Sequence, residues 1–241
     1  MFSLDDKYKV GKKIPMKDFI PKDLKATDKR KIKEYVKSCT LTYQISGENI
    51  PSLVNSEYNV QIIQFYDFEI EDIKKATFIA NTYQNIIKSP CVIRLYNTTS
   101  EIYSFALKRL NQNDNSQVVV TDNLLTSDFM IGITSSIKQE FKNHLNFNKI
   151  IAKQNKNASY LEMYVKAYIL TKDKLYVGAK DFLKRKDIWH NENKVRELYS
   201  NLRALELLNL SLFKAVGNAD KVKINKEIKR LLEILEENAD E

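Results

Sequence analysis

The chain has 241 residues, of which 43% are hydrophobic and 29% charged, and its net charge is +8. This composition is typical of a globular protein with one large or two small domains, and five glycines and four prolines argue against long disordered linkers. No stretch approaches the ~18 apolar residues of a membrane-spanning helix. The amino terminus carries acids where a signal peptide has an apolar core. We therefore expect a cytoplasmic protein without membrane contact.

Positive charge is concentrated in two places. Residues 1–37 contain 12 Lys and Arg against 6 Asp and Glu, and a second basic stretch covers residues 172–186. Basic patches of this kind attract nucleic-acid phosphate. A lysine-rich solvated surface has the same composition, so both interpretations stay open at this point.

The first half of the chain alternates between helical and extended patterns. Residues 1–26 are predicted to be irregular or weakly extended, because Pro15 and Pro21 interrupt regular secondary structure there. Thr27 and Asp28 have N-cap chemistry and precede a short amphipathic helix with a basic outer face. Strands are predicted where apolar and polar residues alternate, and helices where the spacing is three or four. In chain order the pattern predicts a helix at 29–37, strands at 39–45 and 58–70, and a helix at 71–87.

A hairpin follows in the next part of the sequence. Strands are predicted at 91–96, 103–110 and 117–121, and a helix at 135–145. The polar turn at 111–116 joins the last two strands, and Lys108 and Arg109 give this hairpin a basic tip. The order of elements predicts an α+β fold for residues 1–150, with a mixed or antiparallel sheet and flanking helices.

Residues 151–241 have an almost wholly helical pattern. Helices are predicted at 159–170, 179–185, 191–216 and 221–237. The third of these carries a heptad seam of apolar residues with Asn209 at one core position. Gly217 and Asn218 break the pattern. We therefore expect a helical C-terminal region in which residues 191–238 form either a long antiparallel helical hairpin or an intermolecular coiled coil.

Few residues suggest catalysis. The sequence lacks the glycine-rich loops that bind nucleotide phosphates. It also lacks the motifs of serine hydrolases and zinc proteases. Cys39 and Cys91 are isolated and are expected to be reduced core residues. Asp67 and Glu69 share one face of the 58–70 strand, as do the Mg²⁺-binding carboxylates of many nucleases, but no acid-any-lysine triplet accompanies them. They remain catalytic candidates in a sequence that indicates no metal site and no cofactor.

Four segments resemble a known family. They are IPMKDFI at 14–20, NVQIIQFYDFEI at 59–70, YSFALKRLNQND at 103–114 and NADKVKINKEIKRL at 218–231. Their order resembles the bacterial family called domain of unknown function 4391, and the resemblance covers nearly the full length. Met16 stands where that family usually has Lys, and Lys17 follows one place later.

The resemblance implies a context and no catalytic residues. The family's members are similar to accessory proteins encoded beside helicases and DNA methyltransferases in restriction-like or phage-defence loci. We therefore expect an accessory module that binds nucleic acid, a helicase or methyltransferase partner, or both. The alternatives are a protein-interaction or dimerisation subunit that acts through its C-terminal helices, and a divergent metal-dependent nuclease. The candidate nucleic-acid contacts are Lys12, Lys13, Lys29, Arg30, Lys31, Lys108, Arg109, Lys184, Arg185 and Lys186.

Overall fold

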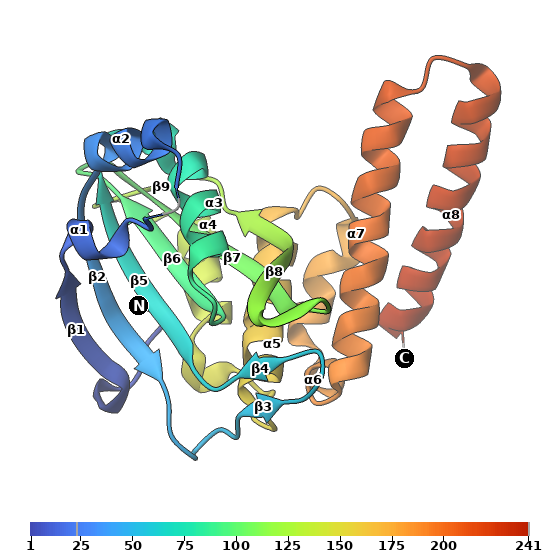
Figure 1. Ribbon diagram of the computed structural model, residues 1–241. Coiled ribbons are helices and arrows are strands. Elements are labelled where there is room, and N and C mark those ends of the chain that lie inside the picture. The colour runs from blue at the N-terminus through green and yellow to red at the C-terminus, as the bar shows by residue number, and fades with distance from the viewer. Residues whose placement is uncertain (23, 241) are drawn as a thin grey trace. The chain divides into compact units, whose positions relative to one another are not determined.

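The computed structural model describes residues 1–22 and 24–240, with side chains up to residue 237 (Figure 1). The chain forms two compact units, Met1–Tyr164 and Val165–Glu241, which we call the sheet unit and the helical unit. The boundary expected between residues 150 and 151 precedes helix α5 (Lys156–Thr171), and the chain passes from one unit to the other within this helix.

The sheet unit is built on a mixed sheet. Among the described residues it has seven strands in the order β1-β2-β5-β6-β7-β8, with β9 also paired to β7. Neighbouring strands are antiparallel except β5 and β6, which are parallel. The strands are β1 (Lys9–Ile14), β2 (Val36–Ile45), β5 (Ile63–Ile70), β6 (Cys91–Tyr96), β7 (Ser100–Asn111), β8 (Asp114–Leu125) and β9 (Phe129–Met130). This arrangement confirms the predicted α+β class.

Smaller elements complete the sheet unit. A separate two-stranded ribbon consists of β3 (Leu53–Val54) and β4 (Asn59–Val60). The α-helices before α5 are α1 (Met16–Phe19), α2 (Ala26–Tyr35), α3 (Ala76–Ile86) and α4 (Ser136–His144). The 3-10 turns are η1 (Asp6–Tyr8), η2 (Ile73–Lys75) and η3 (Phe147–Lys149). Helix α3 connects the parallel strands β5 and β6, as a parallel pair requires a crossover.

The two faces of the sheet differ in chemistry. Alternation along β5 places Tyr66 and Phe68 in a core cluster with Ile79, Ala80 and Tyr83 of α3. The residues between them point to the opposite face. That face has an aromatic cluster of its own, formed by Phe2, Tyr103, Phe105, Phe129 and Phe141. The part of this face around Asp67, Arg94 and Glu101 is polar and holds the site described below, and we call it the polar face.

The helical unit contains the C-terminal hairpin. After α5 it comprises η4 (Val177–Lys184), α6 (Lys186–Trp189), α7 (Glu192–Lys214) and α8 (Asn218–Asp240). Asn191 caps α7 by accepting hydrogen bonds from the backbone of Asn193 and Lys194. Helices α7 and α8 run antiparallel and contact each other (Figure 1), which confirms the predicted helical hairpin within one chain.

Five details of the structure differ from the sequence prediction. Strand β1 lies in a segment predicted to be irregular or weakly extended, because its exposed edge position leaves no apolar alternation to read. The single strand predicted at 58–70 is two strands, and the helix predicted at 179–185 is the 3-10 element η4. Helix α2 begins at Ala26, after Lys25, instead of after the expected Thr27 and Asp28 caps. Asn209 is exposed and not part of a core.

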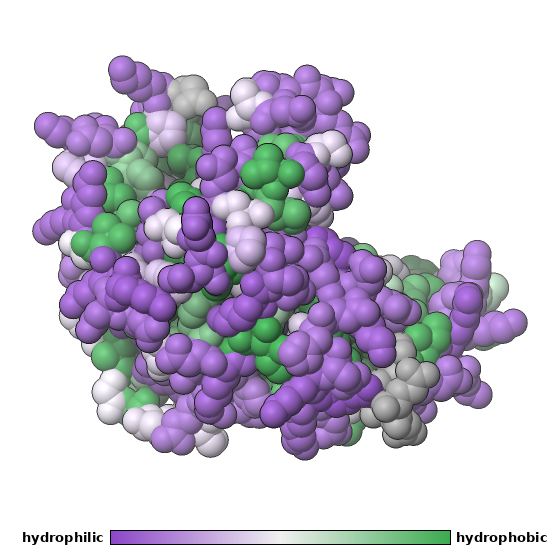
Figure 2. Space-filling view, turned by 90° about the horizontal axis from the view of Figure 1, so that it is seen from below, coloured by the Kyte–Doolittle hydropathy of each residue, from purple (hydrophilic) through white to green (hydrophobic). Residues whose placement is uncertain are grey.

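The surface is predominantly hydrophilic on the side drawn in Figure 2, where hydrophobic side chains form patches separated by polar ones. Within the described part of the chain, no helix has both the length and the apolarity to cross a bilayer. The two cysteines, Cys39 and Cys91, are buried and free, as expected for reduced core residues, and burial raises the pKa of both thiols.

Candidate functional site

One row of residues crosses five strands on the sheet face opposite α3. Lys13 of β1 pairs with Thr40 of β2, and Thr40 pairs with Asp67 of β5. Asp67 in turn pairs with Arg94 of β6, and Arg94 pairs with Tyr103 of β7. Because directly paired residues of neighbouring strands point to the same face, the register alone places these five side chains in one line across the sheet.

Arg94 joins two carboxylates at the centre of this row. Its Nη1 donates to Oδ2 of Asp67 at 3.0 Å, and its Nε donates to Oε2 of Glu101 at 2.6 Å. The guanidinium also lies over the ring of Tyr96, 4.5 Å from the centroid. A guanidinium bound on two sides and stacked on a ring is held in one orientation. The network therefore gives the site a fixed centre.

Helix α4 supplies two cations to the same network. Ser135 caps this helix by accepting a hydrogen bond from the Lys138 backbone, and Lys138 and Lys142 then fall four residues apart on one side of it. Their Nζ atoms lie 2.9 and 3.5 Å from Oε1 of Glu101. The Glu101 side chain is only 3% exposed, whereas that of Lys142 is 51% exposed. Lys142 is thus the solvent-facing member of the group.

The two carboxylates of the network have opposite pKa shifts. Burial alone would raise the pKa of Glu101, but the hydrogen bonds and charges of Lys138 and Arg94 outweigh it and hold this pKa below its ordinary value. Burial raises the pKa of Asp67, and the single bond to Arg94 does not compensate for it. Among the described residues, Oδ1 of Asp67 and Oε1 of Glu101 are both buried without a hydrogen-bond partner, but Oε1 of Glu101 lies 2.9 Å from the Lys138 ammonium. Asp67 is therefore the carboxyl whose second oxygen forms neither a hydrogen bond nor an ion pair within this network.

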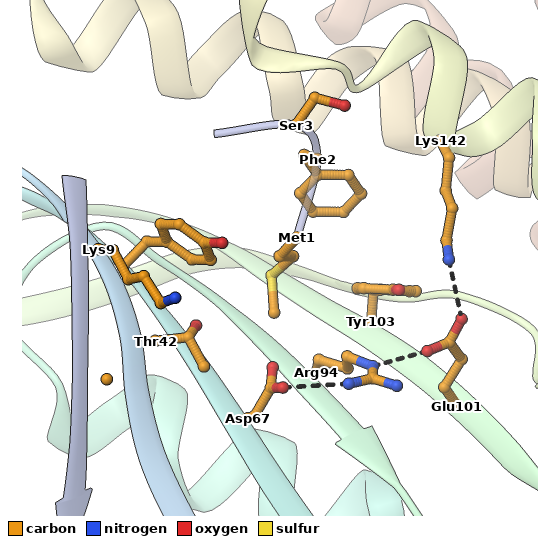
Figure 3. A pocket seen from close by; sticks show the side chains of 12 residues that line it. Met1, Phe2, Ser3, Lys9, Thr42, Asp67, Arg94, Glu101, Tyr103 and Lys142 are labelled. Carbon is orange, nitrogen blue, oxygen red and sulfur yellow. Dashed lines mark hydrogen bonds and ion pairs between the residues drawn. The ribbon is translucent and has the colours of Figure 1, made fainter. Parts of the chain in front are cut away.

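A cavity of about 520 Å³ opens beside this network (Figure 3). Its wall combines cations, hydroxyl groups and aromatic rings from strands β1, β2, β5, β6 and β7, from α4 and from the N-terminal segment. It is lined by Met1, Phe2, Ser3, Lys9, Gly11, Thr42, Tyr43, Asp67, Arg94, Glu101, Tyr103 and Lys142. The volume lies within the range of pockets that bind small molecules or single groups of larger ligands.

The N-terminal segment forms one side of the cavity. The Phe2 side chain is buried, with its ring centroid 5.2 Å from that of Tyr103 and 6.1 Å from that of Phe141. Phe2 and Ser3 have positive φ angles of 47° and 51°, a conformation that non-glycine residues adopt at a cost. The aromatic contacts of Phe2 offset that cost and hold the segment against the sheet. In Figure 3 the side chain of Met1 points from this segment toward Asp67 and Arg94.

The two catalytic candidates lie on this face but do not form a metal centre. Asp67 lines the cavity and is bound to Arg94, and Glu69 accepts a hydrogen bond from Ser38 Oγ at 3.1 Å. A guanidinium next to a carboxylate competes with a divalent cation for the same oxygens. Within the described residues, no group of three or more His, Cys, Asp or Glu side chains is arranged to hold a metal ion.

The predicted basic contacts on β1 fall on different faces of the sheet. Lys12 pairs with Leu41, which belongs to the core cluster on the α3 side, whereas Lys13 pairs with Thr40 on the cavity side. Both lysines are exposed. Two adjacent residues of the predicted set are thus separated by the pleat of one strand, and only Lys13 shares the face of Asp67.

The remaining predicted contacts lie elsewhere on the chain. On α2, Lys29 donates to the carbonyl of Lys22, Arg30 is exposed, and Lys31 lies near Asp28 and over the ring of Phe78. In the helical unit, Lys184 and Arg185 form ion pairs with Asp181 and Asp187, and Lys186 is exposed. None of these side chains lines the cavity.

Lys108 lies in the interior, where its ammonium binds backbone carbonyls. Its side chain is buried, and its ammonium donates to the carbonyls of Ile87 at 2.6 Å and Ser89 at 3.1 Å. Burial lowers the pKa of this amine. Arg109, its neighbour, is half-buried and donates to the carbonyl of Leu110. The hairpin predicted around them is confirmed as β7 and β8, but both residues lie on β7 ahead of the turn, not at its tip.

Sequence reasoning missed most of the residues that form the site. Arg94 belongs to a strand that is otherwise apolar, and a charged residue inside such a strand is the signal that would have identified it, whereas Glu101 shares β7 with Lys108 and Arg109. Lys9, Lys138 and Lys142 have no such signal, because exposed lysines are common throughout this sequence. Asp67 was predicted because an acid is conspicuous in the otherwise apolar strand expected at 58–70.

A family model described as Domain of unknown function (DUF4391) matches residues 2–235, which is nearly the whole chain. The protein belongs to the DUF4391 family. Neither a curated protein nor a solved structure matches this DUF4391 member.

Proposed function

We propose that this DUF4391 protein is a nucleic-acid-binding accessory module, and that the polar face of its sheet receives the phosphate backbone. The observation that carries the proposal is the set of exposed cations around the cavity. Lys9 and Lys142 line it, and Lys13 stands at the edge of the same face. Lysines that converge on a concave surface bind phosphate groups as point charges.

The charge balance of the N-terminal part of the chain adds a long-range attraction for the same ligand. Residues 1–37 carry 12 basic and 6 acidic residues, although α1 and α2 pack on the core cluster of the opposite face. The buried carboxylate of Glu101 is paired with Arg94, Lys138 and Lys142, so the exposed lysines of this face that lie outside the network are Lys9 and Lys13. Such an excess of positive charge raises the local concentration of a polyanion and speeds its association.

The neighbouring polar and aromatic groups fit a nucleotide unit better than an isolated anion. Thr42 and Tyr43 line the cavity beside Lys9, and their hydroxyl groups can exchange hydrogen bonds with a base or a sugar. Single-stranded nucleic acids are bound by this combination of a basic groove and aromatic rings. The ligand that we propose is therefore a nucleic-acid strand with one nucleotide at the cavity.

The family resemblance selects DNA as the first ligand to test. Accessory proteins encoded beside helicases and DNA methyltransferases in restriction-like or phage-defence loci act where DNA strands are opened or modified. We propose that this protein works in such a system as a binding component. The carboxylates of the cavity then orient Arg94 and the bound strand, and they need not cleave it.

A titration of labelled DNA tests the proposal. Fluorescence anisotropy with single-stranded and duplex DNA of one length, at two salt concentrations and with or without Mg²⁺, gives affinity and salt dependence together. We expect binding that weakens steeply with salt and a triple variant, Lys9→Glu, Lys13→Glu and Lys142→Glu, that has lost it. The variant Lys194→Glu, which changes an exposed lysine at the start of α7, shows the effect of one charge reversal outside the cavity face and is compared with each single Lys→Glu variant.

The same samples distinguish binding from cleavage. Mg²⁺-dependent DNA cleavage that disappears in Asp67→Ala would replace our proposal with the nuclease alternative. Equal binding by the wild-type protein and the triple variant would show that the polar face is not the contact surface. Absence of binding at low salt would refute nucleic-acid recognition altogether.

A further inference from the structure

A run of exposed apolar side chains lies along the second half of α7 and continues past its end. Leu207 and Leu210 are 49% and 51% exposed, and Phe213 is 91% exposed. Residues three apart in a helix are neighbours on its surface, so these three form one continuous strip. Val216 in the connection and Val222 in the first turns of α8 are also exposed, at 92% and 70%. We call Leu207, Leu210 and Phe213 the apolar strip.

The strip contrasts with the first half of the same helix. There the apolar residues Val195, Leu198, Leu202 and Leu205 are all buried. Side chains as large as Phe213 are seldom left almost fully in water, and contiguous apolar surface on a globular protein marks a contact with another molecule. The first half of α7 is thus an ordinary core helix, and its second half has an uncovered apolar surface.

A small hollow lies at the end of the strip. It measures about 350 Å³ and is formed where α7 ends and α8 begins. Ala215 and Ile224 contribute apolar surface to it, Lys214 and Lys223 contribute cations, and Asp220 contributes a carboxylate. The hollow is open and shallow, so it offers room for one side chain of a partner that lies along the strip.

The charges around the strip indicate the chemistry of the occupant. Residues 207–226 contain the lysines Lys214, Lys221, Lys223 and Lys226 and one acid, Asp220. No ion pair engages these four lysines among the residues whose side chains are described. A second copy of the chain would bring the same cations against each other, which opposes association, whereas an acidic partner neutralises them.

We infer that the apolar strip is the docking surface for an acidic amphipathic helix of a different protein. The apolar residues of that helix lie along Leu207, Leu210 and Phe213, and its carboxylates meet the lysines around the hollow. This is the recognition mode in which an amphipathic helix uses anchors spaced by three or four residues. The inference concerns the helical unit alone and does not rest on the proposed nucleic-acid function.

A designed peptide tests the inference on the full-length protein. The probe is a fluorescent helical peptide with leucine on one face and glutamate on the other, and its counterpart has lysine in place of glutamate. We expect the acidic peptide to bind and the basic peptide not to bind. We further expect Phe213→Ser and Lys214→Glu each to weaken the binding by about tenfold or more. Fluorescence of Trp189, which is buried in the helical unit, verifies that both variants are folded.

Val177→Ser provides the matched control, because Val177 is 98% exposed in the helical unit but lies outside the strip. We expect this variant to bind the acidic peptide as the wild type does. Equal binding of both peptides, or binding that Phe213→Ser leaves unchanged, would overturn the inference. A wild-type dimer that Phe213→Ser converts to a monomer would assign the strip to a second copy. Binding to phosphatidylserine vesicles that the same variant abolishes would assign it to a membrane.

Discussion

Nε of Arg94 lies 2.6 Å from Oε2 of Glu101, a carboxylate whose side chain is 3% exposed. The two residues come from neighbouring antiparallel strands and meet on the polar face of the sheet. A buried charge pair is costly to form and still more costly to break, because the remaining partner stays desolvated. This relationship makes Arg94 a fixed element of the cavity wall and leads to the first two predictions.

Removing the charge of Glu101 should destabilise the protein. We expect Glu101→Gln to lower the free energy of unfolding by about 3 kcal/mol at neutral pH. The cations of Arg94, Lys138 and Lys142 then lose the buried negative charge that balances them. Urea denaturation followed by circular dichroism measures the change. The control is Glu69→Gln, whose carboxylate is half-buried and accepts one hydrogen bond from Ser38. A loss of equal size in the control would contradict the assignment.

The two carboxyl groups that Arg94 joins should respond to pH in opposite directions. Because the folded pKa of Glu101 is lowered, its contribution to stability is present above its ordinary value of 4.5 and is lost as the pH falls. The folded pKa of Asp67 is raised above 3.8, so its contribution is present at low pH and is lost as the pH rises through the folded pKa. We therefore expect Glu101→Gln to flatten the loss of stability between about pH 5 and pH 3.

Asp67→Asn completes this comparison. We expect it to leave stability at neutral pH unchanged or increased, because the neutral amide avoids the burial penalty that raises the pKa of Asp67. Denaturation of both variants over a pH series gives the answer. If Asp67→Asn destabilises the protein as strongly as Glu101→Gln at pH 7, the claim that the pKa values of the two carboxyl groups are shifted in opposite directions is wrong.

Lys108 should prove structural when it is replaced. We expect Lys108→Ala to lower the free energy of unfolding by about 3 kcal/mol, because the carbonyls of Ile87 and Ser89 lose their donor and the buried stem leaves a cavity. DNA affinity, measured below the unfolding transition, should stay within about twofold of the wild type. A large loss of affinity without a loss of stability would return Lys108 to the binding surface.

A second buried lysine should control a loop. Lys156, at the start of α5, donates to the carbonyls of Gly47 and Ile50 at 2.9 and 2.6 Å and to Ser52 Oγ at 3.2 Å. Without this ammonium the loop after β2 loses its three side-chain contacts to α5. We expect Lys156→Met to increase amide exchange and proteolytic cleavage at residues 46–52 while exchange in β5 and β6 stays slow. Unchanged exchange in the loop would contradict this role.

The sequence predicts the elements of this fold better than the roles of its charged residues. The period-two pattern of β5 and the switch to helical spacing in α3 identify the centre of the sheet, because the buried faces there are strongly apolar. Strand β1 is solvated along its length and leaves no such pattern. Lys12 and Lys13 look equivalent in the sequence, and only the register with β2 separates them.

The charged residues of the site were harder to predict for a related reason. Glu101, Arg94 and Lys142 come together from β7, β6 and α4, and their pairing depends on tertiary contacts that no local pattern records. For Lys108 the error was the opposite one. The sequence predicted an exposed residue of a basic tip, but its ammonium is bound to backbone carbonyls inside the protein. Asp67 was identified as a candidate because an acid in an apolar strand is conspicuous from the sequence alone.

The central claim is that nucleic acid binds the face of the sheet that carries Asp67. The most direct measurement compares Lys13→Glu with Lys12→Glu in titrations of labelled single-stranded DNA over a salt series, because these exposed neighbours differ chiefly in the face they occupy. We predict that Lys13→Glu weakens binding by about tenfold and reduces the salt slope by about 1, while Lys12→Glu has less than half that effect on the slope. Equal losses in the two variants, or a larger loss in Lys12→Glu, would contradict the account.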